Sequence, residues 1–285
     1  MQMIKVIATD LDGTLFFPKR RFTLLTKKNN RFLKKHVENG NEVVLVTGRN
    51  SKLTKRIAKK IGTPLSYIAC NGGFVFKDGE LLMENCIEHE EAKKLYYSLK
   101  DDKRIKVWIM MTDHDGMYTQ SKNCNLFEKI AYRIGLAFQG AYHEKYVFGE
   151  KAIVGMLDNP DIHIYKMMPI FGYTKKSKEV SRLASNELRE RFGDTFEVAW
   201  SNEACELMKK GTSKADSLKQ LIKSLEVSED EVAVIGDSGN DISLFKAFHK
   251  NSFVMSHAHD VVKKEAKYII DSVSDIEKYL EEGEK

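Results

Sequence analysis

Residues 3–14 read MIKVIATDLDGT, and this stretch decides the fold. Residues 3–9 form a short apolar run rich in β-branched side chains, which is typical of a strand buried on both faces. The run stops at an acidic, glycine-containing turn that begins with Asp10. A buried strand that leads into such a loop is the unit from which parallel sheets build their binding sites.

Outward from this strand, helical and strand patterns alternate along the chain. Helices are expected over residues 26–38 and 50–61, and strands over residues 42–47 and 65–70. The same rhythm returns near the C-terminus, with helices over 211–226, 242–248 and 276–282 and strands over 231–235, 253–256 and 268–270. Strands joined by helices predict a parallel sheet between two helical layers.

The middle of the chain breaks this rhythm. Residues 74–83 alternate around a Lys-Asp-Gly-Glu turn, which predicts a hairpin. Residues from about 88 to 202 then show a mixed order, with helices over 90–99, 126–134 and 175–192 and strands over 106–112, 162–170 and 195–200. This segment is therefore expected to be an α+β insert with a core of its own.

Composition excludes several classes of protein. The chain has 285 residues, 42% hydrophobic and 31% charged, which is ordinary for a globular protein. Its apolar runs are far shorter than the roughly 20 residues that cross a bilayer, and its first residues lack the pattern of a secretory signal. We therefore expect a cytoplasmic protein with no membrane partner.

The cysteines and the charged residues argue against several kinds of site and partner. The four cysteines are scattered without a Cys-x-x-Cys pair, which argues against a disulfide framework and a structural zinc site. The net charge of +5 comes from basic residues interspersed with acidic ones. A solvated surface is therefore a better interpretation than a nucleic-acid partner.

Acidic residues follow two of the expected strands. Asp10 and Asp12 come directly after the first strand, and Asp237 and Asp241 follow the strand over 231–235. Carboxylates gathered at the carboxyl edge of one sheet would repel one another unless a cation held them. Because Mg²⁺ prefers oxygen ligands, the sequence predicts a magnesium site.

Groups that bind anions are expected beside these carboxylates. Thr47, Gly48 and Arg49 end the second strand and supply a hydroxyl and backbone N–H groups at a helix start. Lys214 lies in the first turn of a later helix and adds a compact positive charge. A metal, amides and a lysine together favour a phosphate pocket.

These motifs, in this order, resemble the haloacid dehalogenase-like phosphohydrolases, and among them the Cof-type sugar-phosphate phosphatases. The nucleophile loop of that family is matched by residues 10–14, the second motif by residues 47–49, the third by Lys214 and the fourth by residues 236–241. The turn Asn71-Gly72-Gly73 is also similar to one typical of the Cof branch. An ordered set of four motifs is far more specific than a single glycine pattern.

The resemblance implies a role for each matched residue. Asp10 would attack phosphorus to form an aspartyl-phosphate, and Asp12 would act as general acid and then general base. Mg²⁺ would be held by Asp10, the backbone carbonyl of Asp12 and Asp237, with support from Asp241, while Thr47 and Lys214 would bind phosphoryl oxygens. The remaining expected substrate contacts are Leu11, Gly48, Arg49, Asn71, Gly72, Asn240 and His257.

One position departs from the family pattern. Cof relatives usually have an Asn-Ala pair after the fourth motif, where this chain has His257-Ala258. A side chain expected near the phosphate is thus changed. The substitution leaves the role of His257 open, with substrate preference or pH dependence as the properties it could alter.

The sequence therefore predicts an α/β fold with a Rossmann-like three-layer core, a mostly parallel sheet and an inserted α+β cap domain. The expected boundaries are 1–85 and 203–285 for the core and 86–202 for the cap, which would form a mobile lid. The expected function is Mg²⁺-dependent hydrolysis of a small phosphorylated metabolite, by a monomer or weak homodimer. Phosphoryl transfer by a phosphomutase, or phosphate-ligand binding without turnover, are the alternatives.

Overall fold

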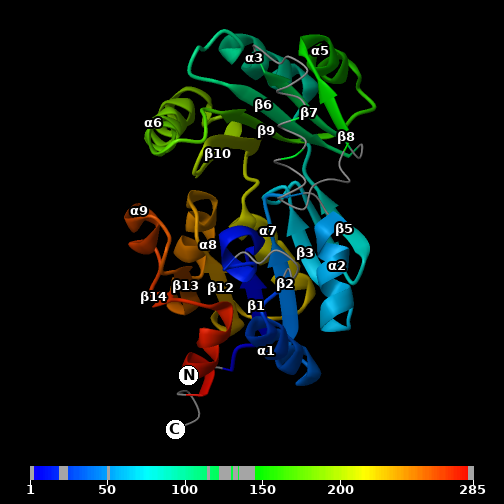
Figure 1. Ribbon diagram of the computed structural model, residues 1–285. Helices are drawn as coiled ribbons and strands as arrows, with labels where there is room; N and C mark the ends of the chain where they lie inside the picture. Colours follow the sequence, from blue (N-terminus) through cyan, green and yellow to red (C-terminus); the bar gives the residue numbers. More distant parts are fainter. Residues whose placement is uncertain are drawn as a thin grey trace. The chain divides into compact units, whose positions relative to one another are not determined.

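A computed structural model describes residues 3–18, 25–49, 52–113, 116–121, 130, 134 and 145–281 of the chain. The chain divides into two compact units. We call Met1–Glu84 with Thr212–Lys285 the core unit, and Asn85–Gly211 the insert. Figure 1 shows the helices and strands of both units in order along the chain.

The core unit contains a sheet of eight described strands in the order β14-β13-β12-β1-β2-β3-β4-β5. The strands from β14 to β3 pair in parallel, and β4 and β5 continue the sheet as an antiparallel hairpin. The strands are β1 (Val6–Thr9), β2 (Glu42–Val46), β3 (Ser66–Ala69), β4 (Phe74–Lys77), β5 (Glu80–Glu84), β12 (Val232–Gly236), β13 (Ser252–Met255) and β14 (Tyr268–Ile270).

Central strands of this sheet are buried on both faces. Every residue of β1 and β12 is buried, and Ala8 of β1 is in register with Val234 on one side and Val44 on the other. Such strands require a helical layer on each face. The helices of the core unit are α1 (Lys27–Glu38), α2 (Lys52–Ile61), α7 (Lys214–Ser224), α8 (Ile242–Ala247), α9 (Asp260–Lys263) and α10 (Glu277–Glu281). The predicted α/β fold class, with its mostly parallel sheet and α+β insert, is confirmed.

The insert has a second sheet, in the order β10-β11-β9-β6-β7-β8, which is antiparallel except for the β7–β8 pair. Its described strands are β6 (Val107–Thr112), β7 (Gly116–Ser121), β8 (Lys145–Phe148), β9 (Ile164–Ile170), β10 (Phe196–Ser201) and β11 (Ala204–Lys209). Its helices are α3 (His89–Leu99), α5 (Glu150–Asp158) and α6 (Lys175–Phe192).

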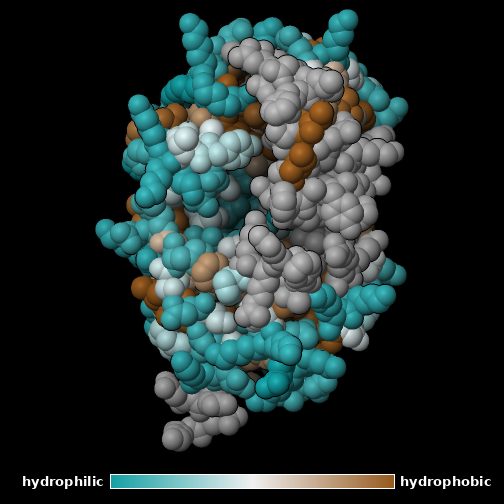
Figure 2. Space-filling view, viewed as in Figure 1, coloured by the Kyte–Doolittle hydropathy of each residue, from teal (hydrophilic) through white to brown (hydrophobic). Residues whose placement is uncertain are grey.

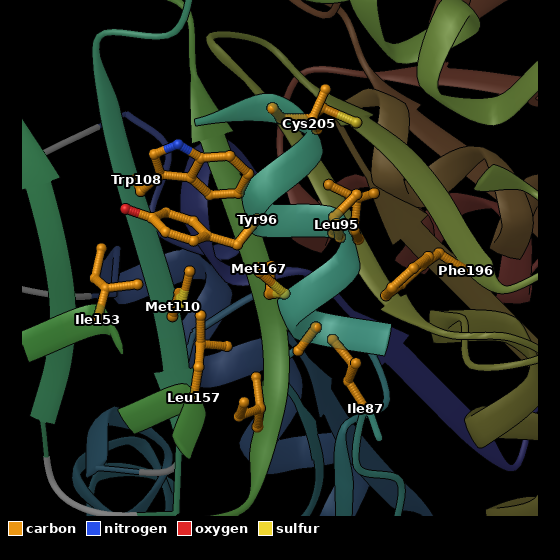
Figure 3. Close-up of a cluster of buried hydrophobic side chains, with 14 of the residues drawn as sticks. Ile87, Leu95, Tyr96, Trp108, Met110, Ile153, Leu157, Met167, Phe196 and Cys205 are labelled. Atoms are coloured by element: carbon orange, nitrogen blue, oxygen red, sulfur yellow. The ribbon is translucent and has the colours of Figure 1, made fainter. Parts of the chain in front are cut away.

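Side chains from these three helices bury one face of the second sheet. Tyr96 of α3 meets Trp108 of β6 edge to face, with ring centroids 5.5 Å apart. Leu157 of α5 and Leu188 of α6 belong to the same buried cluster, part of which Figure 3 shows. The insert therefore has a hydrophobic core of its own, as the sequence predicted.

The predicted boundary at residues 202/203 is wrong. Residues 204–209 form β11, which pairs with β10 and β9 inside the insert, so the core unit resumes at Thr212. Asn202 has a φ of 45°, and with Glu203 it makes the tight turn that reverses the chain between β10 and β11. Asparagine favours both loops and hairpin turns, so Asn202 by itself does not distinguish the end of the insert from a hairpin within it.

The order of elements in the insert also differs from expectation. Gly116, where a turn was expected, is the first residue of β7. The strand β8 and the helix α5 were not predicted. The start of the insert at residue 85 lies one position before the predicted one. The helix expected over 126–134 falls almost entirely outside the described residues.

The surface of the described residues is mainly hydrophilic on the face that Figure 2 shows, with hydrophobic residues scattered among the hydrophilic ones. Among the described helices, none combines the length and the apolar character that a bilayer crossing requires.

One buried histidine lies far from the acidic loops. His36 of α1 is 6% exposed, and its Nε2 atom has no hydrogen-bond partner among the described residues. Burial lowers the pKa of His36 to about 4, although the backbone carbonyls of Lys5 and Glu42 oppose this shift. The folded protein therefore holds this imidazole neutral at pH values where the unfolded chain protonates it.

Protonation of His36 should make the protein less stable in acid. Because its pKa is lower in the folded state, the unfolded state binds more protons below pH 6.5, and stability is lost as the pH falls from 6.5 toward 4. In this window the wild type should lose up to about 3 kcal/mol more unfolding free energy than His36→Asn. Urea unfolding at a series of pH values measures the difference, with the exposed His249→Asn as control. Parallel pH profiles for wild type and His36→Asn would contradict this account.

Candidate active site

Three neighbouring strands deliver their following loops to one edge of the core sheet. Because β12, β1 and β2 are adjacent and parallel, the residues after them leave the sheet on the same side. The N–H of Asp10 donates to the carbonyl of Ile235 at 2.9 Å, and the N–H of Thr47 donates to that of Ile68 at 2.8 Å. The expected site residues of these loops therefore begin from fixed backbone positions.

The turn after β1 is shaped by glycine. Gly13 has a φ of 79°, in the left-handed region, and a Cβ added to it would lie 2.3 Å from Oδ2 of Asp237. Only glycine therefore fits both the backbone conformation and the space. Thr14 completes the contact, because its Oγ1 donates to Oδ1 of Asp237 at 2.9 Å. The loops after β1 and β12 are thus pressed together.

A buried lysine links two of the acidic loops. Nζ of Lys214 lies 2.7 Å from Oδ1 of Asp10 and 2.7 Å from Oδ1 of Asp241, and its side chain is almost completely buried. Burial disfavours the ammonium, but the two carboxylates outweigh that effect and raise the pKa of Lys214. Lys214 is therefore a permanent positive charge at the floor of the site.

Asp241 has both carboxylate oxygens engaged. Oδ1 accepts from Lys214, and Oδ2 accepts from the N–H groups of Asp237 and Ser238 at 3.0 Å each. A Cβ added to Gly236 would lie 2.3 Å from Cγ of Asp241, so the carboxylate is packed directly on the backbone. This arrangement suits Asp241 to hold the loop and Lys214 in place rather than to bind a cation directly.

Asp10 and Asp237 have the properties of cation ligands. Single carboxylate oxygens of Asp10, Asp237 and Asp241 lie within 4.8 Å of one another. Burial is the main cause that raises the pKa of Asp10 well above its usual value, with added repulsion from Asp241 and Asp237. Burial and the charge of Asp241 likewise raise the pKa of Asp237 to about 7. Crowded, buried oxygen ligands fit Mg²⁺, which would relieve both effects.

Asp12 is bound by Arg49. The Nε atom of Arg49 donates to Oδ2 of Asp12, and Nη2 donates to Oδ1 at 2.7 Å, so the guanidinium holds both carboxylate oxygens. Arg49 was expected to contact substrate, and in this structure its guanidinium binds the expected acid/base residue. Thr47 lies beside this pair: it is buried, and its Oγ1 accepts from the N–H of Arg49 at 3.1 Å.

The turn after β3 is fastened to two neighbouring segments. Asn71 has a φ of 58° and is buried, its N–H donates to the carbonyl of Thr47 at 3.0 Å, and its Oδ1 accepts from Nδ2 of Asn240 at 3.4 Å. Gly72 lies against α7, where an added Cβ would be 2.4 Å from Oγ of Ser217. The structure thus places Asn71 and Asn240 together beside the loop of Thr47.

His257 lies next to Asp237. Its Nε2 is 3.8 Å from Oδ2 of Asp237, and its ring stacks on Phe17 with centroids 3.9 Å apart. Burial and then the charge of Lys263 lower the pKa of His257, which favours the neutral imidazole. The structure therefore puts this departure from the family pattern at the border of the acidic cluster.

Three expected contact residues can offer only their backbones. Leu11 has a fully buried side chain, and Gly48 and Gly72 have none. Sequence reasoning assigned no role to Thr14, which holds Asp237, or to Phe17, which supports His257. Thr14 lies within the acidic turn and could have been assigned from its position. Phe17 gave no signal, because its partner lies 240 positions away along the chain.

Comparison with known proteins gives a family. A model of the haloacid dehalogenase-like hydrolases matches residues 7–279. The chain is 26% identical to the 5-amino-6-(5-phospho-D-ribitylamino)uracil phosphatase YbjI of Escherichia coli (strain K12), covering 93% of this chain and 90% of that one. It is 25% identical to the phosphatase YwtE of Bacillus subtilis (strain 168), named for the same substrate, covering 94% of this chain and 93% of that one.

A solved structure shares the fold. The structure of a haloacid dehalogenase-like hydrolase from B. subtilis superimposes with a TM-score of 0.77 at 22% sequence identity. The superposition covers 97% of this chain and 100% of that protein. The match extends over both units, so the insert is part of the shared fold.

Gly13→Ala should disable the acidic cluster by displacing Asp237. We expect a loss of cation affinity of at least about tenfold, because the added Cβ overlaps the carboxylate, and a further backbone cost of about 1 kcal/mol. Gly40 is a matched control, since its φ of 80° is nearly the same and an added Cβ meets nothing within 4 Å. Calorimetric titration with Mg²⁺ and thermal unfolding measure the two effects. Equal Mg²⁺ affinities for Gly13→Ala and Gly40→Ala would refute the displacement.

Proposed function

Because the chain belongs to the haloacid dehalogenase-like hydrolases, we propose that it is a phosphatase that hydrolyses small phosphomonoesters through Asp10. One observation carries the proposal: Asp10 is buried at the carboxyl edge of the sheet, with the ammonium of Lys214 on one oxygen and Asp237 beside it. A carboxylate held in this way has a fixed positive charge on one oxygen.

The first chemical step uses Asp10 and Asp12. An oxygen of Asp10 forms a bond to phosphorus while the bond from phosphorus to the ester oxygen breaks. Asp12, two residues further along the same turn, gives its proton to the departing alkoxide, which leaves as an alcohol. The product of this step is a phosphoryl group covalently attached to Asp10.

The second step returns both residues to their starting states. A water molecule attacks phosphorus, Asp12 takes the proton of that water, and the bond to Asp10 breaks to release inorganic phosphate. Lys214, Thr47 and nearby backbone N–H groups are suited to bind the phosphoryl oxygens on which charge accumulates. Thr47 can do so because its Oγ1 accepts from Arg49, which leaves its hydroxyl proton to be donated.

Mg²⁺ is the cofactor that the donor set favours. Asp10, Asp237 and the backbone carbonyl of Asp12 would hold it, with Asp241 fixing the loop between them. A bound magnesium ion would offset the repulsion between the carboxylates and the incoming phosphate and stabilise charge on the phosphoryl oxygens. The raised pKa values of Asp10 and Asp237 support this assignment, because burial and the neighbouring carboxylates disfavour their charged forms and a bound cation would offset both effects.

A phosphorylated sugar or sugar alcohol is the proposed substrate class. Its support is the resemblance to Cof-type phosphatases and the name of the E. coli relative, whose substrate carries a phosphate on a ribityl chain. Selection of the substrate by the insert stays a prediction. Phosphoryl transfer to a second metabolite is the alternative with the same chemistry, and it predicts that an added sugar competes with water for the phosphoryl group.

Asp10→Asn should abolish turnover, because an amide is a very poor nucleophile. We expect a loss of about 10⁴-fold or more on p-nitrophenyl phosphate and on a panel of sugar phosphates and nucleotides. The wild type should require Mg²⁺ on the same panel, and the exposed Asp194→Asn should behave as the wild type. Phosphate release measures the rates, and circular dichroism confirms folding. Near-normal turnover by folded Asp10→Asn would eliminate Asp10 as the nucleophile.

The loss of rate caused by Asp12→Ala should depend on the leaving group. Alkyl phosphates need a proton on the departing oxygen, whereas p-nitrophenolate leaves without one. We expect a loss of about 10²–10⁴-fold for a sugar phosphate and a clearly smaller loss for the aryl ester in the phosphorylation step. Single-turnover kinetics with both substrates separate this step from dephosphorylation. Equal losses on the two esters would argue against a general acid at Asp12.

A further inference from the structure

The pairing of Arg49 with Asp12 is a feature that the proposed reaction does not explain. Nε and Nη2 of the guanidinium contact the two oxygens of one carboxylate, the two-pronged geometry in which arginine binds carboxylates and phosphates most strongly. A general acid must carry a proton on one of these oxygens and present it to the leaving group. While both oxygens accept from Arg49, Asp12 is not arranged for that task.

The pair lies open to a ligand. The side chain of Asp12 keeps 40% of its surface exposed, and that of Arg49 keeps 20%. Exposed ion pairs are weak, because water screens them and competes for their hydrogen bonds. A stronger anionic partner can therefore separate Arg49 from Asp12, at a cost of about tenfold in its own affinity.

The backbone of Arg49 is fixed, so a change of partner needs only its side chain. Its N–H donates to Oγ1 of Thr47 at 3.1 Å, and its carbonyl accepts from the N–H of Cys70 at 2.9 Å. The guanidinium thus starts from an anchored loop that also carries Thr47, the residue suited to bind a phosphoryl oxygen. The two possible partners of Arg49, Asp12 and a phosphoryl group, lie at the same edge of the sheet.

We propose that Arg49 is a latch that exchanges the carboxylate of Asp12 for a phosphoryl oxygen of the bound substrate. In the free protein it holds Asp12 in an idle ion pair. A phosphate dianion is the better partner for the two-pronged guanidinium, because it carries more charge and offers the same spacing of oxygens. Binding of the phosphoryl group and release of the acid/base residue then become one event. This inference rests on the proposed function of the site.

The latch makes Asp12 a competitor of phosphate for Arg49, and equilibrium binding of inorganic phosphate tests this directly. Four proteins are compared in the presence of Mg²⁺: wild type, Asp12→Asn, Arg49→Gln and the double variant. Asp12→Asn should bind phosphate about tenfold more tightly than wild type, because Arg49 is released. In the Arg49→Gln background the same change should alter phosphate affinity less than threefold.

Simple charge repulsion predicts the opposite order. Without Arg49 the charge of Asp12 is no longer neutralised, so its removal should then help phosphate more than it does in the wild type. A gain from Asp12→Asn that is equal or larger in the Arg49→Gln background would overturn the latch. Arg49→Lys keeps the charge but cannot contact both oxygens. In this background the gain in phosphate affinity from Asp12→Asn should lie between the gains in the wild type and in Arg49→Gln.

A matched pair elsewhere controls for the loss of an ion pair as such. Arg104 contacts both oxygens of Asp102 in the insert, and Arg104→Gln and Asp102→Asn should leave phosphate affinity unchanged. Phosphorus NMR titration gives the dissociation constants, and thermal unfolding shows that each variant is folded. Turnover is recorded separately. A hydrolytic wild type without coupling between Arg49 and Asp12 would remove the latch alone, whereas coupling without hydrolysis would remove the proposed function alone.

Discussion

The ammonium of Lys214, buried between Asp10 and Asp241, is the interaction on which the site depends. It joins three segments that are far apart in the sequence, since Asp10 and Lys214 are 204 positions apart. A buried charge without a partner is costly, and breaking such a pair by removing one member typically costs about 3–5 kcal/mol. The start of α7 is therefore held to the ends of β1 and β12, and the loops that bear the carboxylates cannot separate.

Close backbone contact strengthens this constraint. Gly13 and Gly236 each leave room for a carboxylate where a Cβ would overlap it. As a result, Asp237 and Asp241 are pressed into a space with little water, and burial raises the pKa of Asp237 to about 7. The fold thus stores unfavourable electrostatics at one edge of the sheet. A cation of the right size removes them, which is why a site so crowded is better suited to bind a metal than to remain empty.

Patterns of neighbouring residues in the sequence predicted the strands and turns that form from neighbouring residues. The strand over residues 3–9 and the acidic turn after it were visible as an apolar run and a glycine-containing loop. The parallel order of strands then follows from helix and strand alternation. The extent of the insert could not be predicted in this way, because the turn at Asn202 looks the same whether it ends a domain or a hairpin. Residues 204–209 belong to the insert only through pairing with strands that are distant in sequence.

The convergence of Asp10 and Asp237 could be anticipated, since residues that follow parallel strands meet at one edge, whereas Lys214 follows a strand of the insert and was expected near them from the family resemblance. The hydrogen-bond and ion-pair partners of these side chains could not be predicted from the sequence. The contact between Arg49, an expected substrate contact, and Asp12 was not predicted. Asp241 was expected to support the metal site, and its partners in the structure, Lys214 and two backbone N–H groups, were not predicted. Rotamer choice and competition between charged groups decide these contacts, and neither can be inferred from a single sequence. Once Arg49 neutralises Asp12, three carboxylates in the described site face one buried ammonium, an excess of negative charge that repels a phosphate dianion and that a divalent cation would neutralise. By charge alone, a bound cation would thus favour phosphate binding, and the proposed exchange at Arg49 would link phosphate binding to the release of Asp12.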